Sequence, residues 1–477
     1  MLGRREQQES FFDSEIFSRM VPEDHPLELI KRHVDFSFVE EECRGHYHPD
    51  LGRPSFPPEV LFRVLFLEVW ANLSDIQVCR ELRYNVLYRH FCGIGWDDAV
   101  PDDTTLVVFR RRLGEETFHR LFSRVVGQAR DKGLLRGKWA IVDGTQVTAH
   151  AAAKTTVRLA REGRKKLLGV LSRHDARLAK ELEAFGEPER DSDYADHGRL
   201  LAAELDKGRE LILRLKDRTE PDLVALREFY RQVVDSEGPA SFSDPDARWG
   251  FKRKGEPFLG YKVHVSTDET GMATAVKVTP GNAAELPELA SLLEDLDREG
   301  LRPLHLTADK GYDDAKTRQA LLEAGIRPYI PSRYDLGRLK KMGLVYDPRR
   351  GTLTCPEGRK AAGRTPHKGG GFIYYFSEHD CRDCPSRLCG LGVSETRLRV
   401  YVNPGVFTHR ARGLKRAMRI RKTIERLFGE LKVWHRMARA RYRGLSRVTI
   451  QVLLTLIVAN AKKMAKRLQA QSSPSPA

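Results

Sequence analysis

Residues 138–150 read KWAIVDGTQVTAH, and this stretch decides the fold class that the sequence predicts. It is short, apolar and rich in β-branched residues, which predicts a β-strand with Asp143 at or near its middle. Burying a lone carboxylate in such a strand is costly unless another group pairs with it. The pattern therefore predicts a strand and, at Asp143, an acid that needs a partner.

The stretches that follow predict a mixed α/β sheet. Further strands are expected at residues 257–268, 271–280, 303–309 and 327–331, and helices at 284–300 and 314–325. Three consecutive strands, then helix, strand, helix, strand and a late helix, is an order that resembles ribonuclease-H-like folds. Many other α/β domains share this order, so it does not define the fold by itself.

The chain as a whole predicts five segments. Residues 1–135 are mostly helical and predict an N-terminal, DNA-binding domain. The α/β core comes next, carrying one helical and one Cys-containing, strand-rich insertion, and the chain ends in a polar, Pro/Ser-rich tail that we expect to be disordered. The bounds of these segments are 136–345, with the helical insertion 154–250 inside it, 346–400 for the Cys-containing insertion, 401–467 for the last core helices, and 468–477.

Local signals support the helical interpretation of the first segment. Pro57 and Pro58 stand where prolines open a helix, and Ser74 with Gln77 forms a capping-box pattern. These helices carry the arginines Arg80, Arg83, Arg89 and Arg110 to Arg112. The arginines indicate either a DNA-binding bundle or a helical packing domain with a solvated basic face.

Charge points to a polyanionic partner. The 477 residues include 82 Lys and Arg against 66 Asp and Glu, a formal net charge of +16. Residues 410–443 are the most basic part, with 13 Lys and Arg and only two acids, Glu425 and Glu430. A solvated basic helix is the simpler interpretation of such a run. The carboxylate in its middle favours a site that handles phosphate.

Apolar patterning argues against a membrane partner. No stretch reaches the ~18 apolar residues that suggest a spanning helix. The longest apolar run, Val448 to Ala459, is shorter and predicts a buried helix. The first residues, MLGRREQQES, show no apolar signal-peptide core. We therefore expect a cytoplasmic protein.

Two further acids join Asp143 as candidates. Asp309 ends an apolar strand, and for both aspartates the simpler interpretation is a turn-forming residue at a strand end. Arg421, Glu425 and Lys432 fall within one arc of a predicted helix, because they are four and seven residues apart. The simpler interpretation there is an exposed salt-bridge face that stabilises the helix by about 0.2–0.5 kcal/mol.

The chemistry of phosphodiester cleavage explains these acids as a set. Two Mg²⁺ or Mn²⁺ ions neutralise the phosphate and assist both the attacking and the leaving oxygen. Mg²⁺ prefers hard carboxylate oxygens, so Asp143, Asp309 and Glu425 are the expected ligands. Arg421 and Lys432 are expected to contact the DNA backbone or the scissile phosphate.

The same residues carry a family resemblance. VDGT at Asp143, ADKGYD at Asp309 and R-x3-E-x6-K from Arg421 to Lys432 resemble the three motifs of DDE transposases of bacterial insertion sequences. The pattern is most similar to the insertion-sequence-four-like superfamily, and it extends from about residue 50 to 465. One departure is Met418, where the extended third motif often has a tyrosine that helps to position DNA.

The resemblance implies a function. It implies that Asp143, Asp309 and Glu425 carry metal-dependent hydrolysis at the transposon ends, followed by attack of the freed 3′-OH on target DNA. The implied partners are the terminal inverted repeats and target DNA, and pairing two ends suggests a homodimer acting at the nucleoid. Two alternatives stay open: a ribonuclease-H-like structure-specific nuclease, and a non-catalytic, zinc-bearing DNA-binding protein derived from a transposase.

Four of the seven cysteines cluster late in the chain. Cys355, Cys381, Cys384 and Cys389 give the spacing C-x25-C-x2-C-x4-C. Four thiolates suit tetrahedral Zn²⁺, and C-x2-C is a frequent zinc-ligand spacing. The resembling transposases often carry a similar insert. Both a structural zinc ribbon and four reduced thiols without metal are consistent with this pattern.

Overall fold

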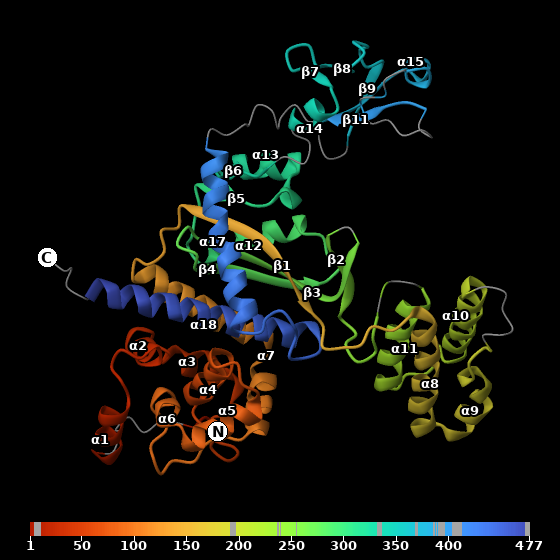
Figure 1. Ribbon diagram of the computed structural model, residues 1–477. Helices are drawn as coiled ribbons and strands as arrows, with labels where there is room; N and C mark the ends of the chain where they lie inside the picture. Colours follow the sequence, from red (N-terminus) through yellow and green to blue (C-terminus); the bar gives the residue numbers. More distant parts are fainter. Residues whose placement is uncertain are drawn as a thin grey trace.

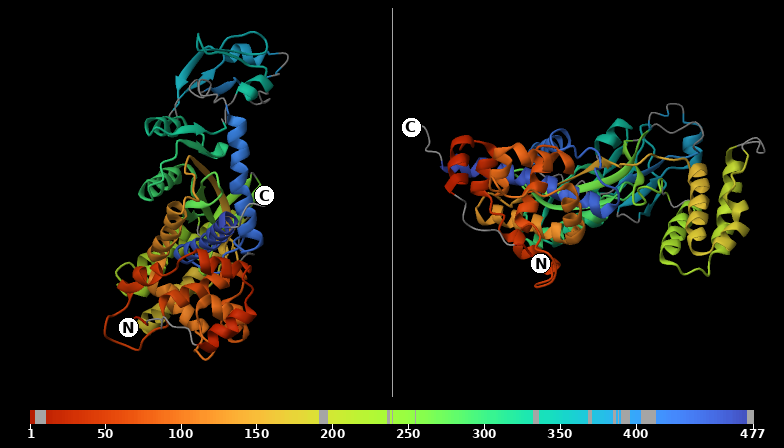
Figure 2. Two further views of the ribbon diagram at one scale, coloured as in Figure 1. Left: turned by 90° about the vertical axis from the view of Figure 1, so that its left-hand side faces the viewer. Right: turned by 90° about the horizontal axis from the view of Figure 1, so that it is seen from below.

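The structure is a computed structural model that places a mixed β-sheet between helical regions (Figure 1). The described residues are 1–3, 11–190, 197–235, 238, 240–253, 255–331, 336–367, 371–384, 387, 389, 396–402 and 413–472. The N-terminal helices lie at one end, the Cys-containing insertion lies at the other, and the helical insertion stands to one side (Figures 1 and 2).

The N-terminal segment is helical, as expected. Its helices are α1 (Phe11–Met20), α2 (Pro26–His33), α3 (Phe38–Cys43), the short 3₁₀ turn η1 (Arg44–His46), α4 (Pro58–Trp70), α5 (Asp75–Tyr84), α6 (Val86–Cys92) and α7 (Asp103–Asp131). Pro58 opens α4, and the capping box of Ser74 and Gln77 is present. The last of these helices, α7, kinks at Gly114, where φ is 65°.

The central sheet has six strands. They are β1 (Trp139–Thr148), β2 (Arg248–Arg253), β3 (Glu256–Thr267), β4 (Ala273–Pro280), β5 (His305–Thr307) and β6 (Arg327–Tyr329). The main order is β2-β3-β1-β5-β6. β4 also pairs with β3, along the part of β3 that follows its pairing with β2. β1 runs antiparallel to β3 and parallel to β5. Asp143 is in the middle of β1, which confirms the predicted strand.

Helices cover this sheet and join it to the N-terminal helices. They are α12 (Leu286–Arg298), α13 (Ala315–Glu323), α17 (Leu414–Val433) and α18 (Leu445–Ser472). α18 lies between the sheet and the N-terminal helices, and all three share one hydrophobic core (Figure 1). Among the described residues, α18 is the one helix long and apolar enough to cross a membrane, but 89% of that apolar window is buried in the protein.

The expected disordered tail is wrong for its first residues. α18 continues through Ser472, whereas we expected disorder from residue 468. Leu468 packs against the main core, and Gln469 lies 3.4 Å from the His33 ring. These tertiary contacts hold a polar sequence in helical form. Residues 473–477 of the predicted tail lie outside the described part of the chain.

The helical insertion has its own small core. It contains α8 (Thr156–His174), α9 (Ala176–Glu181), the 3₁₀ turn η2 (Glu183–Gly186), α10 (His197–Arg214) and α11 (Pro221–Val234). Arg164 and Glu204 pair inside it and are both fully buried. The helices end at Val234, and β2 begins at Arg248, so the expectation of helix up to about residue 250 missed one edge strand.

The Cys-containing insertion forms a third packing unit, called here the cysteine module (residues 336–402). It contains α14 (Leu336–Lys341), β7 (Val345–Asp347), β8 (Thr352–Thr354), β9 (Gly363–Pro366), β10 (Phe372–Tyr375), α15 (Glu378–Arg382) and β11 (Arg399–Val402). Leu339 and Leu344 are part of its core, so this packing unit begins before residue 346.

Candidate active site

Sheet register brings the two candidate aspartates to the same level. β1 and β5 are parallel, and Ile141 is the partner of Thr307. Asp143 comes two residues after Ile141, and Asp309 comes two residues after Thr307. Adjacent strands are about 4.8 Å apart, and residues two apart share a face. The register therefore points both carboxylates to one side of the sheet.

Backbone amides hold the two carboxylates. Asp309 Oδ1 accepts a hydrogen bond of 2.6 Å from the Gly311 N–H and caps the 3₁₀ turn η4 (Lys310–Tyr312). Asp143 Oδ1 accepts from the Gly144 N–H at 2.9 Å. Glycine follows both acids closely, and the chain turns or extends there without a side chain in the way. These contacts orient the acids from their own strands.

The helix α17 brings a third acid to this place. It crosses the sheet and packs against β1 and β5 (Figures 1 and 2). The Arg421 guanidinium donates to Asp143 Oδ2 and, through its other nitrogen, to Glu425 Oε1 at 2.6 Å. Arg421 and Asp143 are 21% and 16% exposed, whereas Glu425 is 49% exposed. One arginine thus bridges a strand acid and a helix acid that are far apart in sequence.

The electrostatics of Asp143 report on this crowding. Burial, helped by the nearby Asp309 and Glu425 carboxyls, raises the pKa of Asp143 to about 6, against the lowering effect of Arg421 and the Gly144 N–H. An acid whose pKa is raised beside two further carboxylates is a typical arrangement for a cation site, since a cation relieves their repulsion.

The carboxylate oxygens of Asp143, Asp309 and Glu425 are donors that suit a divalent cation, but the three side chains are not close enough together to bind one ion. Within the described part of the chain, no three His, Cys, Asp or Glu side chains are placed to hold one metal ion. Arg421 provides the positive charge between Asp143 and Glu425. An ion shared by these two acids therefore requires the guanidinium to move aside. The hard oxygen donors fit Mg²⁺ or Mn²⁺.

The other charged residues of α17 serve different roles. Burial opposes ionisation of Glu430, but hydrogen bonds from His435 and Lys462 lower its pKa to about 2. Glu430 thus ties α17 to α18. Lys432 does not reach the carboxylates: burial, with Lys252 of β2 nearby, lowers its pKa. Lys432 and Lys252 thus place two positive charges close to each other.

Three polar residues near the acids escaped the sequence analysis. A β-carbon placed on Gly144 would lie 3.7 Å from Glu285 Oε1, 3.7 Å from His264 Nδ1 and 3.8 Å from the Tyr312 hydroxyl oxygen. His264 and Tyr312 are fully buried. The glycines beside the two aspartates were the available signal, since a glycine often marks a close approach of other groups.

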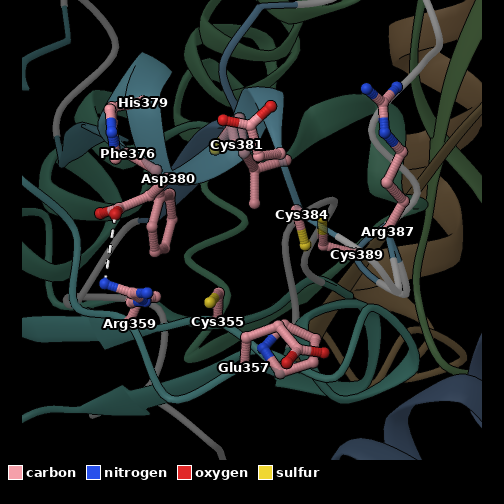
Figure 3. Close-up of a pocket in the computed structure, with 13 residues that line it drawn as sticks. Cys355, Glu357, Arg359, Phe376, His379, Asp380, Cys381, Cys384, Arg387 and Cys389 are labelled. Carbon is pink, nitrogen blue, oxygen red and sulfur yellow. Dashed lines mark ion pairs between the residues drawn. The ribbon is translucent and has the colours of Figure 1, made fainter.

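The candidate zinc ligands line one cavity in the cysteine module. Its volume is about 340 Å³, and Cys355, Cys381, Cys384 and Cys389 all border it (Figure 3). They come from the β8–β9 loop, α15 and the loop after α15. Their thiols are not at the mutual spacing of a metal site. All four are reduced, and Arg359 pairs with Asp380 at the rim at 3.3 Å.

Two of the predicted DNA-binding arginines have structural roles instead. Arg89 is 5% exposed and donates to the carbonyls of Trp96 and Asp98, and Arg110 is 8% exposed and pairs with Glu68 and Asp75. They were expected on a DNA-facing surface, but burial removes them from it. Arg80, Arg83, Arg111 and Arg112 are exposed.

Polar contacts near the C-terminus hold α18 in place. The Asn460 side chain makes two hydrogen bonds with the backbone of Ala273, at 2.8 and 2.9 Å. Asp244 accepts from the Gly444 N–H, and Asp246 accepts from the Leu445 N–H at the start of α18. These contacts lock α18 against β4 and against the loop that precedes β2. The sequence around Gly444 therefore secures the position of the helices that carry the site.

Comparison with known proteins matches two parts of the chain to transposase families. Residues 15–112 match a family model described as a transposase domain (DUF772), and residues 227–461 match one described as a transposase DDE domain. The chain is similar to the transposase for insertion sequence element IS1106 of Neisseria meningitidis serogroup B, with 31% identity over 245 residues. This match covers 50% of the chain and 60% of that relative's length.

These matches assign the family. The chain belongs to the DDE transposases of insertion sequences. Proteins of this family generally use divalent metal ions. The second match begins within α11 and includes Asp309 and Glu425, whereas Asp143 precedes it.

Proposed function

We propose that this protein is a transposase that cleaves the ends of its own element and joins them to target DNA. The observation that carries the proposal is the meeting of Asp143, Asp309 and Glu425, from two neighbouring strands and a crossing helix, around Arg421. Membership in the DDE transposases supports it. The alternatives, a structure-specific nuclease and a non-catalytic DNA-binding protein, become outcomes of the test.

We also propose that the core is ribonuclease-H-like. The support is the strand order β4-β3-β1-β5-β6, in which three antiparallel strands precede two parallel ones. In this arrangement β1 is central, and its neighbour β5 ends beside it. Acids at the middle of one strand and the end of the next then share a surface that a late helix covers.

The acids are proposed to hold two Mg²⁺ or Mn²⁺ ions. Bound there, such ions neutralise phosphate charge and make water or a 3′-hydroxyl a better nucleophile. Asp143 supplies a ligand from β1, Asp309 supplies one from the turn after β5, and Glu425 supplies one from α17. When Arg421 leaves the carboxylates, its planar guanidinium is placed to hold a phosphate with two hydrogen bonds. Lys432 and Lys252 attract the flanking backbone.

The proposed reaction has two balanced steps. Water attacks a phosphodiester at the element end, so a P–O bond to water forms, the bond to the 3′ oxygen breaks, and a free 3′-OH remains. That 3′ oxygen then attacks a target phosphodiester and displaces another 3′ oxygen, which takes the proton. No external energy source is needed in the second step, because one phosphodiester replaces another.

The cysteine module is proposed to hold one structural Zn²⁺. Its support is the placement of Cys355, Cys381, Cys384 and Cys389 around one cavity (Figure 3). Binding would draw the four thiols together, because zinc supplies folding energy to small metal-bound modules. The exposed arginines around the cavity, such as Arg359, would then present a firm basic surface to DNA.

The proposed partners are the terminal inverted repeats of the element and target DNA. The net charge of +16 and the exposed Arg80 and Arg83 favour DNA contact by the N-terminal helices. Acting on two ends at once requires two active sites, so a homodimer is the proposed active form. The proposed location is the cytoplasm, at the nucleoid, where the DNA lies.

A strand-transfer assay tests the proposal. Purified protein, Mg²⁺ and labelled DNA ending in the inverted repeats are expected to give both a 3′-OH cut and a joined product. Asp143→Asn, Asp309→Asn and Glu425→Gln should each lower joining about a thousandfold, since metal-assisted charge stabilisation contributes several kcal/mol. Glu294→Gln, at an exposed acid of α12, is the control. Cleavage without joining would favour the nuclease, and binding without cleavage the non-catalytic protein.

A further inference from the structure

A fourth carboxylate stands at the candidate active site. Glu285 immediately precedes α12, and its Oε2 would lie 2.6 Å from a β-carbon on Gly311, while Asp309 Oδ1 would lie 2.7 Å from the same β-carbon. One point in space therefore lies close to an oxygen of each acid. A side chain at position 311 would therefore crowd both carboxylates, and the glycine leaves that space open.

Buried polar atoms surround the other oxygen of Glu285. The Tyr312 hydroxyl and His264 Nδ1 face the space over Gly144 that Glu285 Oε1 also faces. Both atoms are buried and have no hydrogen-bond partner among the described residues, although His264 Nε2 lies 3.1 Å from Thr279 Oγ1. Buried polar atoms without partners are rare in folded proteins and point to a ligand or a rearrangement. Burial raises the pKa of Tyr312, and Glu285 is the nearest acid to add to this effect.

Charge balance gives the fourth acid a purpose. Two divalent ions bring four positive charges, whereas Asp143, Asp309 and Glu425 bring three negative charges, of which Arg421 offsets one. Lys262 Nζ lies 3.9 Å from Glu285 Oε1, within ion-pair distance, and also donates to the Ala283 carbonyl at 2.8 Å. Glu285 therefore adds a negative charge close to Asp309.

We propose that Glu285 is a fourth carboxylate ligand of the cation site, binding the ion held by Asp309 while Tyr312 and His264 orient its second oxygen. This inference rests on the proposed two-metal function. It gives the residue that precedes α12 a role in cation binding. The three acids and the basic residues of α17 do not by themselves account for that role. It also explains why both neighbouring aspartates are accompanied by glycines.

Direct cation binding tests the proposal without using activity. Electron paramagnetic resonance of free Mn²⁺, titrated with the full-length, metal-free protein, gives the affinity. Glu285→Gln is expected to weaken binding by about tenfold or more, the range seen when groups supporting a metal site are removed. Glu294→Gln, on the same helix and exposed, should bind Mn²⁺ like the natural protein. The Mn²⁺-induced rise in melting temperature should shrink in parallel.

The comparison with Asp309→Asn separates the two proposals. If Asp309→Asn loses Mn²⁺ binding and Glu285→Gln does not, the role of Glu285 is refuted and the proposed function stands. If both variants bind like the natural protein, the cation site itself is refuted. Should Glu285→Gln fail to fold, Glu285→Asp keeps the charge but withdraws the oxygen by one methylene. Unchanged Mn²⁺ affinity in Glu285→Asp would then overturn the assignment.

Discussion

The carboxylate site and the cysteine module are two candidate cation sites built in opposite ways. Asp143 stands on β1, and Asp309 follows β5 by two residues, so the register of two core strands places both acids. The cysteines stand on loops and one short helix of a module with its own small core. The first site is therefore shaped by the fold before any cation binds, whereas the proposed zinc would bring the ligands of the second together.

The difference shows how each site gains its order. In the sheet, many backbone hydrogen bonds and buried side chains hold the two acids in position. The free energy of folding of this large core offsets the electrostatic repulsion between the acids. In the module, few buried residues are available, so a metal would have to contribute much of the stability. The carboxylate site should lose function but not structure without its cation, and the module should lose structure.

The largest expected effect is on the cysteine module. Replacing Cys384 and Cys389 together by serine should reduce bound zinc from one ion per chain to none, and make residues 336–402 sensitive to protease. Structural zinc sites contribute about 10–16 kcal/mol of binding energy to folding. The rest of the chain should unfold at its normal temperature, because its core is separate.

Cys79→Ala, at a buried cysteine of α5, is the matched control for zinc content. Metal analysis and limited proteolysis provide the measurements. A natural protein that contains no zinc, yet resists protease throughout the module, would contradict the comparison.

The next largest effect concerns the arginine in the carboxylate site. Arg421→Gln should tighten Mn²⁺ binding, since the guanidinium competes with the cation for Asp143 and Glu425. Hydrogen bonds to charged groups contribute about 1.5–3 kcal/mol, which corresponds to roughly tenfold to a hundredfold in affinity. DNA joining should fall at the same time, because the phosphate loses a ligand.

These opposite changes separate competition from simple damage to the site. Calorimetric titration with Mn²⁺ and the strand-transfer assay measure them. Arg426→Gln, at an exposed position of α17, should change neither strongly. Weaker Mn²⁺ binding in Arg421→Gln would show that the arginine supports the cation site rather than opposing it.

A smaller effect is expected from the two glycines. Gly311→Ala would place a methyl group under 3 Å from the oxygens of Glu285 and Asp309, so one acid must shift and Mn²⁺ affinity should fall about tenfold. Gly144→Ala meets its polar neighbours at 3.7–3.8 Å, an ordinary contact, and should lower the affinity less. Equal Mn²⁺ affinities in the two variants would mean that the crowding at Gly311 has no bearing on the cation.

The smallest effect should come from the pair of lysines Lys432 and Lys252. Lys432→Ala should leave Mn²⁺ affinity unchanged and weaken DNA binding about uniformly over sequence, with the salt dependence shallower by about one unit. The reason is that Lys432 lies beside Lys252, not beside the carboxylates. Lys165→Ala, exposed on α8 of the helical insertion, is the comparison variant. A loss of Mn²⁺ binding in Lys432→Ala would extend the cation site beyond its proposed limits.

Local patterns predicted much of the architecture. The apolar, β-branched stretch around Asp143 forms β1, the turn at residues 268–271 joins β3 and β4, and the run Val448–Ala459 lies in a buried helix. Helical spacing correctly placed Arg421 and Glu425 on one face. These features depend on short-range periodicity, which is why the sequence contains them.

Long-range contacts account for what the patterns missed. Arg89 and Arg110 look like surface arginines in sequence, but buried carbonyls and carboxylates bind them. The sequence pattern around Glu285 is that of any helix start, and only the close approach of Gly311 and Gly144 places it beside the aspartates. The glycines at positions 144 and 311 indicate a close approach of other groups, but no local pattern says which residues approach, because these are distant in the chain.

The amino-acid sequence by itself determined which residues form strands and helices, the basic character of α17, and the family to which the motifs belong. The tertiary structure alone decided that Asp143 and Asp309 lie at one level, that Arg421 stands between two acids, and that Glu285 joins them. The physical reason is that periodicity depends on neighbours a few residues apart. The meeting of charges depends instead on sheet register and on the packing of a distant helix.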